Sequence, residues 1–73
     1  MTIQGEKPFS VVAHSLAISP SAQGYTLQYS ADGIGWTSYP DAIPANETLV
    51  INGIPRNLLF KCVGNTDELT ITF

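Results

Sequence analysis

The chain contains few side chains that could act as an acid, a base or a nucleophile. Its single histidine is His14 and its single cysteine is Cys62, whereas nucleophilic catalysis needs a nucleophile, a base and an orienting acid within hydrogen-bonding reach. His14 ends the run Ser10–His14, which is typical of a strand, so we expect it to face solvent or a sheet edge. Cys62 alternates with Leu58 and Phe60 and is predicted to pack as a small buried apolar residue. We therefore predict that the protein is not an enzyme.

The acidic residues form no catalytic or metal-binding pattern either. Most of them lie in predicted turns, where aspartate commonly caps backbone amides. One cysteine and one histidine cannot supply the four ligands of a structural zinc site. We therefore expect no catalytic residue, no cofactor and no metal. The acidic residues are Glu6, Asp32, Asp41, Glu47, Asp67 and Glu68.

The most specific local pattern lies in the segment Ser30–Trp36, which reads Ser-x-Asp-Gly-x-x-Trp. It predicts a hairpin in which Asp32 accepts hydrogen bonds from turn amides, and Gly33 takes a positive φ angle. We expect Trp36 to fold back over the strands. The pattern resembles the Asp-box hairpin of sialidases and related β-proteins, although it lacks the residue between Asp and Gly. The box is structural in those families and lies away from the active site, so the resemblance implies a turn and no hydrolysis.

Several apolar residues fall in predicted loops, where side chains are normally polar. We predict that these residues dock onto a partner. An alternative is a sugar-stacking platform made of exposed aromatic rings, in which Asp41 is a polar neighbour of Trp36 and Tyr39. The rings considered for it are Tyr25, Tyr29, Trp36, Tyr39, Phe60 and Phe73. The predicted interface residues are Trp36, Tyr39, Pro40, Ile54 and Pro55.

The elements that must position these residues are predicted to be strands, because side chains alternate between apolar and polar almost throughout. Gly-, Pro-, Asn- and Asp-rich segments separate the runs. We predict an all-β fold, a small antiparallel β-sandwich or barrel of about six to seven short strands. Residues 1–8 show no pattern and are expected to be an N-terminal arm before a single domain of residues 9–73. The strands are expected near Phe9–Ser19, Tyr25–Ser30, Ile34–Ser38, Thr48–Asn52, Asn57–Val63 and Glu68–Phe73, and the pattern allows a short further strand near Asp41–Ile43.

Composition restricts the class of partner. The 73 residues are 44% hydrophobic and 12% charged, which predicts a folded domain with about half the usual charge content. Such a small, charge-poor domain is a candidate for burial in an assembly. Three basic residues against six acidic ones exclude nucleic acid and an anionic membrane as partners, since both need clustered Lys and Arg. No stretch is long and apolar enough to span a bilayer.

The segments Tyr25–Trp36, Tyr39–Asn46 and Gly53–Pro55 together resemble a family of small structural proteins of crAss-like tailed phages of gut Bacteroidales, the auxiliary or decoration capsid proteins. The resemblance covers about residues 24 to 73 and consists of turn motifs. It implies a non-catalytic virion protein on the capsid surface, made in the cytoplasm of the host bacterium. Its implied partners are the major capsid protein, other virion proteins or copies of itself. Two other classes stay open, a small carbohydrate-binding or phage fibre module and a subunit of another bacterial assembly.

Overall fold

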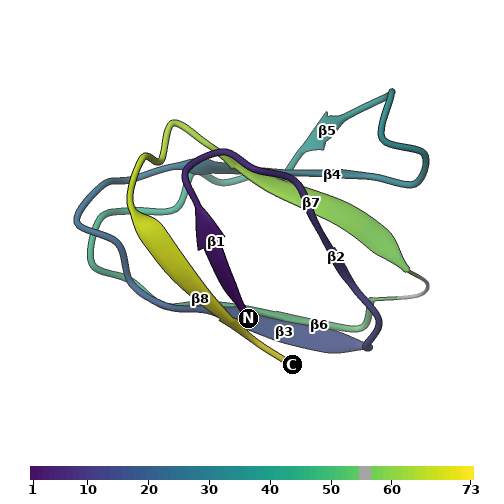
Figure 1. The fold of residues 1–73 in the computed structure, drawn as a ribbon, viewed down its shortest axis with the longest axis horizontal. Helices are drawn as coiled ribbons and strands as arrows, with labels where there is room; N and C mark the ends of the chain where they lie inside the picture. The colour runs from purple at the N-terminus through teal and green to yellow at the C-terminus, as the bar shows by residue number, and fades with distance from the viewer. Residues whose placement is uncertain (55–56) are drawn as a thin grey trace.

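The computed structural model describes residues 1–54 and 57–73 and consists there of strands and loops without a helix. Two four-stranded antiparallel sheets pack together as a small β domain, consistent with a sandwich (Figure 1). One has the strand order β1-β8-β3-β6 and is called the β8 sheet; the other has the order β2-β7-β4-β5 and is called the β7 sheet. The all-β prediction is therefore confirmed. The strands are β1 (Thr2–Gln4), β2 (Phe9–Val11), β3 (Ser15–Ile18), β4 (Thr26–Ser30), β5 (Thr37–Ser38), β6 (Leu49–Asn52), β7 (Leu58–Val63) and β8 (Glu68–Thr72).

The core lies between the two sheets and follows the alternation of the sequence. In β8, Leu69 and Ile71 are buried while their neighbours are exposed. In β7, Phe60 and Cys62 are buried between half-buried neighbours, and Phe60 stacks on Phe9 of β2. Each fully buried large aliphatic or aromatic side chain contributes about 1.5–3 kcal/mol by leaving water. The buried apolar residues are Phe9, Val11, Leu16, Ile18, Tyr25, Leu27, Ile43, Ile54, Phe60, Cys62, Leu69 and Ile71.

The expected long strand Phe9–Ser19 is two strands that belong to different sheets. Its inward residues explain the break: Phe9 and Val11 occupy odd positions, whereas Leu16 and Ile18 occupy even positions. Since side chains of one strand alternate between faces, an unbroken strand would put one pair in solvent. The chain bends between β2 and β3, and there it crosses from the β7 sheet to the β8 sheet.

The N-terminal segment differs from the arm that was expected for residues 1–8. Thr2 to Gln4 form β1, which pairs with β8 in the register Ile3↔Leu69. The main chain of Met1 is tied to Ile71 by two hydrogen bonds, 3.0 Å from the terminal amine to the Ile71 carbonyl and 2.6 Å from the Ile71 amide to the Met1 carbonyl. A run of three residues is too short to show alternation in the sequence. The extended conformation of β1 is therefore explained by its pairing with β8.

The predicted strand Ile34–Ser38 is shortened to β5, Thr37–Ser38. The amides of Ile34 and Gly35 bind the Asp32 side chain, which holds these residues in the turn. The allowed strand near Asp41–Ile43 is present only as a single bridge between Tyr25 and Ile43. The last three predicted strands agree with β6, β7 and β8 to within one residue at each end.

Candidate functional site

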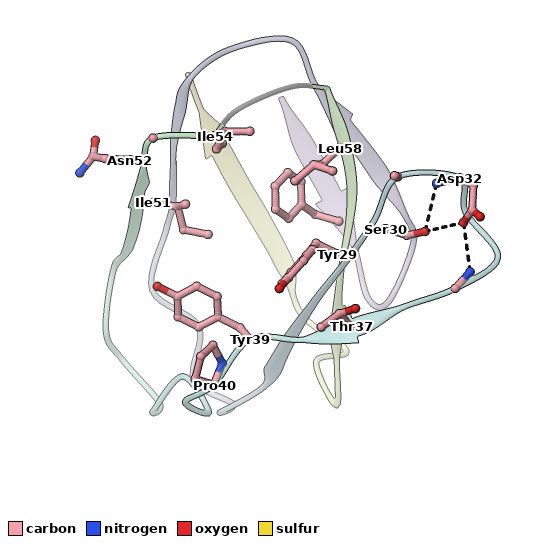
Figure 2. A pocket seen from close by; sticks show the side chains of 14 residues that line it. Tyr29, Ser30, Asp32, Thr37, Tyr39, Pro40, Ile51, Asn52, Ile54 and Leu58 are labelled. Carbon is pink, nitrogen blue, oxygen red and sulfur yellow. Dashed lines mark hydrogen bonds between the residues drawn. The ribbon is translucent and has the colours of Figure 1, made fainter.

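A groove opens between the edge strands β5 and β6, which belong to opposite sheets (Figure 2). It encloses about 560 Å³, within the size range of pockets that bind small ligands or side chains of a partner. We call it the β5–β6 groove. Its lining consists of Tyr29, Ser30, Ala31, Asp32, Gly35, Thr37, Tyr39, Pro40, Ile51, Asn52, Gly53, Ile54, Leu58 and Phe60.

The interior of the groove is apolar and aromatic. Phe60 and Ile54 are buried members of the core that reach its wall. Figure 2 shows Tyr29 and Tyr39 projecting into the space between the two strands, with Ile51 of β6 on the opposite wall. Tyr29, Tyr39 and Ile51 are partly buried and pack against the core. The groove therefore offers a partner an apolar surface that is continuous with the interior of the domain.

One wall of the groove is the hairpin that the Ser-x-Asp-Gly pattern predicts. The Asp32 carboxylate accepts hydrogen bonds from the amides of Ile34 and Gly35 at 2.9 and 3.1 Å and from the Ser30 hydroxyl at 2.9 Å, in part drawn in Figure 2. These bonds, the two amides first and the hydroxyl next, lower the pKa of Asp32, so the carboxylate is charged at neutral pH. Gly33 has φ of 80°, as expected, and a Cβ there would lie 3.1 Å from Leu59 Cδ1.

Trp36 lies away from the groove lining. Its ring is in contact with Lys61 of β7, whose Nζ atom is 4.3 Å from the ring centroid. This contact confirms that Trp36 folds back over the strands. An exposed cation–π pair contributes about 0.5–1 kcal/mol. The sequence thus predicted Trp36 and Tyr39 to share one surface, but the structure separates them.

The other predicted interface residues have mixed outcomes. Tyr39 and Pro40 line the groove, with Pro40 exposed. Ile54 also reaches the lining but is only 3% exposed, so the prediction that it is a docking side chain in a loop is wrong. The reason is local: the Ile54 amide donates to the His14 carbonyl at 2.9 Å, and this bond holds the segment against the β2–β3 bend. Pro55 lies outside the described residues.

The apolar groove residues Ile51 and Leu58 were not singled out from the sequence, and Tyr29 was considered only as one ring of a sugar-stacking platform. All three alternate like core residues, and the sequence placed them in strands. The groove arises because β5 and β6 end up as edges of opposite sheets. Pairing order of this kind leaves no local sequence signal.

The two residues considered for nucleophilic chemistry are placed as follows. His14 is exposed in the bend after β2, and its Nδ1 atom lies 2.9 Å from the Ile54 carbonyl oxygen. Cys62 is 1% exposed, and burial raises the pKa of its thiol to about 11. Tyr25 beside it is also buried, with its hydroxyl unpaired, and its pKa is raised by burial first and by Cys62 second. The thiol is therefore neutral at physiological pH, as expected of a packed apolar residue.

A buried polar cluster is used entirely within the fold. Asn65 has no exposed surface; its Oδ1 accepts from the Ser21 hydroxyl at 2.8 Å, and its Nδ2 donates to the Asp67 carbonyl at 2.7 Å. The Ser21 hydroxyl also lies 3.1 Å from the Asp67 carboxylate. The buried side chains of Ser21 and Asn65 thus bind within the fold, and the cluster joins the β3–β4 loop to the β7–β8 turn.

Comparison of the chain with protein-family models, with curated proteins and with solved structures found no match. Across residues 1–54 and 57–73, no group of three or more His, Cys, Asp or Glu side chains is placed to hold a metal ion. The same residues contain no helix long and apolar enough to cross a membrane.

Proposed function

We propose that this chain is a non-enzymatic structural protein of a virion, an auxiliary capsid protein that binds the major capsid protein and stabilises the phage head. The observation that carries the proposal is the β5–β6 groove, an apolar and aromatic surface that opens on a charge-poor domain. Apolar surface left open in this way commonly marks a protein–protein contact. The sequence resemblance supplies the particular assembly.

Surface area supports a role as a bound subunit. The domain has a solvent-accessible surface of 4213 Å², and a stable contact buries about 800 Å² on each partner, which is roughly a fifth of that surface. Large apolar side chains are also exposed outside the groove, including Ile34 in the hairpin at 86%. Because this surface carries few charged side chains, few charges lose their water when a partner covers it. The desolvation cost of binding is therefore small.

The chemistry of the described side chains is in keeping with a binding role. The thiol of Cys62 is buried and its pKa is raised, so it is a poor nucleophile at neutral pH. Asp32 uses its carboxylate to hold the turn amides. Tyr39 and Thr37 bring only uncharged hydroxyl groups to the groove.

The test is the presence of the protein on purified particles. We expect the wild-type chain in virions, at a copy number that Tyr39→Ala lowers by about tenfold, since losing a half-buried aromatic contact costs about 1–3 kcal/mol. Ser10→Ala, an exposed change in β2, serves as the matched control and leaves occupancy unchanged. Quantitative mass spectrometry of particles measures both. A wild-type chain that never copurifies with particles would contradict the proposal.

The alternative is a small carbohydrate-binding or fibre module, and one observation favours it. The rings of Tyr29 and Tyr39 share the groove with the Thr37 hydroxyl, a combination of stacking surface and a hydrogen-bonding group that suits a sugar. A glycan array followed by titration in NMR separates the two functions. Saturable sugar binding that Tyr39→Ala abolishes, together with absence from particles, would favour the module.

A further inference from the structure

We propose that the β5–β6 groove and the free edge of β6 together bind an extended segment of the partner protein, which adds a fifth strand to the β8 sheet. The segment has alternating apolar side chains that enter the groove, with basic residues beside them. This inference rests on the proposed function, because it names the part of the partner that the groove recognises.

The first observation is the edge of β6. Within the described chain, β6 pairs with β3 on one side and with no strand on the other. Its residues, Leu49–Asn52, include no charge and no proline, although sheet edges are normally protected by lysine, proline, bulges or very short strands. The other edge strands, β1, β2 and β5, have three, three and two residues. Among the strands of residues 1–54 and 57–73, β6 is thus the longest edge, and these residues supply it with no lysine, proline or bulge.

The second observation is that the groove lies directly beside this edge. Leu49 and Ile51 point inward and are half-buried, whereas Val50 and Asn52 point outward and are exposed. A strand added next to β6 would lie about 4.7–4.9 Å away with the same alternation. Its inward side chains would then enter the groove beside Ile51 and contact Leu58 and Tyr39, which line it.

The third observation is charge. Among the described residues that line the groove, Asp32 is the charged one, and its carboxylate accepts three hydrogen bonds from the hairpin. No basic side chain lies among these lining residues. A lysine or arginine next to the apolar residues of the incoming segment would therefore be favoured over an acid.

A compact ligand satisfies only part of this arrangement. A sugar or a small apolar molecule would fill the groove but would leave the amides and carbonyls along the outer edge of β6 to water. An extended peptide supplies both the side chains and the backbone partners, which is how strand addition to an open sheet edge works.

The test uses short synthetic peptides in which leucine or valine alternates with threonine and a lysine stands at each end. Along an extended strand, successive amides point to opposite edges. One peptide is N-methylated at its odd residues and a matched peptide at its even residues, so that each has one edge blocked while the side chains are kept. We expect the unmodified peptide to bind the full chain and one methylated peptide to lose affinity by about tenfold or more, while the other keeps it. Chemical shift changes should lie in β6 and the groove.

A matched pair of variants tests the groove itself. Thr37→Trp places a bulky ring at a lining position of β5, whereas Ser38→Trp places it on the neighbouring residue, outside the groove lining. Both positions are exposed, and far-UV circular dichroism and thermal melting check that each variant folds. Peptide affinity should fall about tenfold or more in Thr37→Trp and stay within about twofold in Ser38→Trp.

The outcomes separate this inference from the proposed function. Strand addition would be overturned if the two methylated peptides bound equally, or if the two variants bound the peptide equally. It would also be overturned if the wild-type chain bound no peptide, or if the groove bound an oligosaccharide saturably in place of the peptide. If Thr37→Trp also keeps full occupancy on virions, the capsid role stands without it. Edge-specific peptide binding by a chain that is absent from particles would instead support strand addition and reject the capsid role.

Discussion

Asp32 holds the hairpin by accepting hydrogen bonds from two turn amides and the Ser30 hydroxyl. The sequence predicted this role from the residue types alone, because an aspartate before a glycine can bind amides of the turn that follows. The same bonds need the ionised carboxylate, since a protonated one accepts more weakly. The stability of the hairpin therefore depends on pH through the exposed side chain of Asp32.

We predict that acid weakens the hairpin through Asp32. The pKa of Asp32 is lower in the folded chain than its ordinary 3.8, so the stabilisation is present above the unfolded value and is lost as the pH falls through the folded value. Asp32→Asn should remove this part of the pH dependence. Urea unfolding of both proteins at neutral pH and at several values below about 4 measures the effect. Identical slopes of stability against pH in the two proteins would contradict the prediction.

Gly33 is the second residue on which the hairpin depends. Its φ of 80° and the short distance of 3.1 Å that would separate an added Cβ from Leu59 Cδ1 both oppose a side chain there. Gly33→Ala should lower the free energy of unfolding by about 1–2 kcal/mol. Gly35→Ala is the control, because its φ angle is not positive and a Cβ there meets nothing within 4 Å. Equal denaturation midpoints for the two variants would count against the strain.

Cys62 gives a chemical prediction at the same scale. Because burial raises the pKa of its thiol to about 11, we expect almost no thiolate at pH 7 and very slow reaction with a disulfide reagent such as Ellman's reagent. The rate should rise by orders of magnitude in urea, when the thiol is released. A fast reaction in the native protein at pH 7 would contradict the burial of this side chain.

At the scale of elements, alternation predicted most strands but not their partners. β6, β7 and β8 were found within one residue, because each is a short run rich in apolar residues between turn segments, and in β8 apolar and polar residues also alternate strictly. β1 was missed, since three residues show no period, and β2 and β3 were merged although the apolar positions change from odd to even between them. That change of parity was visible in the sequence and would have located the bend. Strand order depends on distant pairing and was not visible.

The pairing of β1 with β8 gives a prediction at this scale. Removing residues 1–4 should uncover the edge of β8 and lower the free energy of unfolding by about 2–4 kcal/mol, because several hydrogen bonds and the packing of Ile3 against the core are lost. Thr2→Ala, on an exposed position of β1, should have little effect. Thermal melting and hydrogen exchange of the Ile71 amide, which donates to Met1, measure the loss. Unchanged exchange at Ile71 in the truncated chain would show that β1 does not protect β8.

At the scale of the whole molecule, the candidate site is the groove between the edge strands β5 and β6 of the two opposite sheets. Tyr39 and Pro40, which the sequence proposed as interface residues because they are apolar and lie in a predicted loop, both line the groove. The sequence could not supply Ile51 and Leu58, which look like ordinary core residues until the sheets are assembled. These residues reach the groove only because distant strands pack together.

Because Ile54 is packed in the core, its substitution should affect the stability of the fold rather than a docking contact. As a buried residue of the core, Ile54→Ala should cost about 2–4 kcal/mol of stability, whereas Tyr39→Ala, at a half-buried position, should cost less. Chemical denaturation of both variants measures this difference. If Ile54→Ala melted like the wild type, its side chain would be available for docking after all.

The tie between Met1 and Ile71 also bears on how the molecule acquires its shape. Residues 2–4 are synthesised before residues 68–72, yet they are neighbours in one sheet, and Figure 1 shows the ends of the chain side by side. The first strand therefore cannot pair until the last has left the ribosome. Such distant pairing makes folding slow, on the order of milliseconds to seconds, and a nascent chain stalled before β8 would expose an unmatched apolar layer to chaperones.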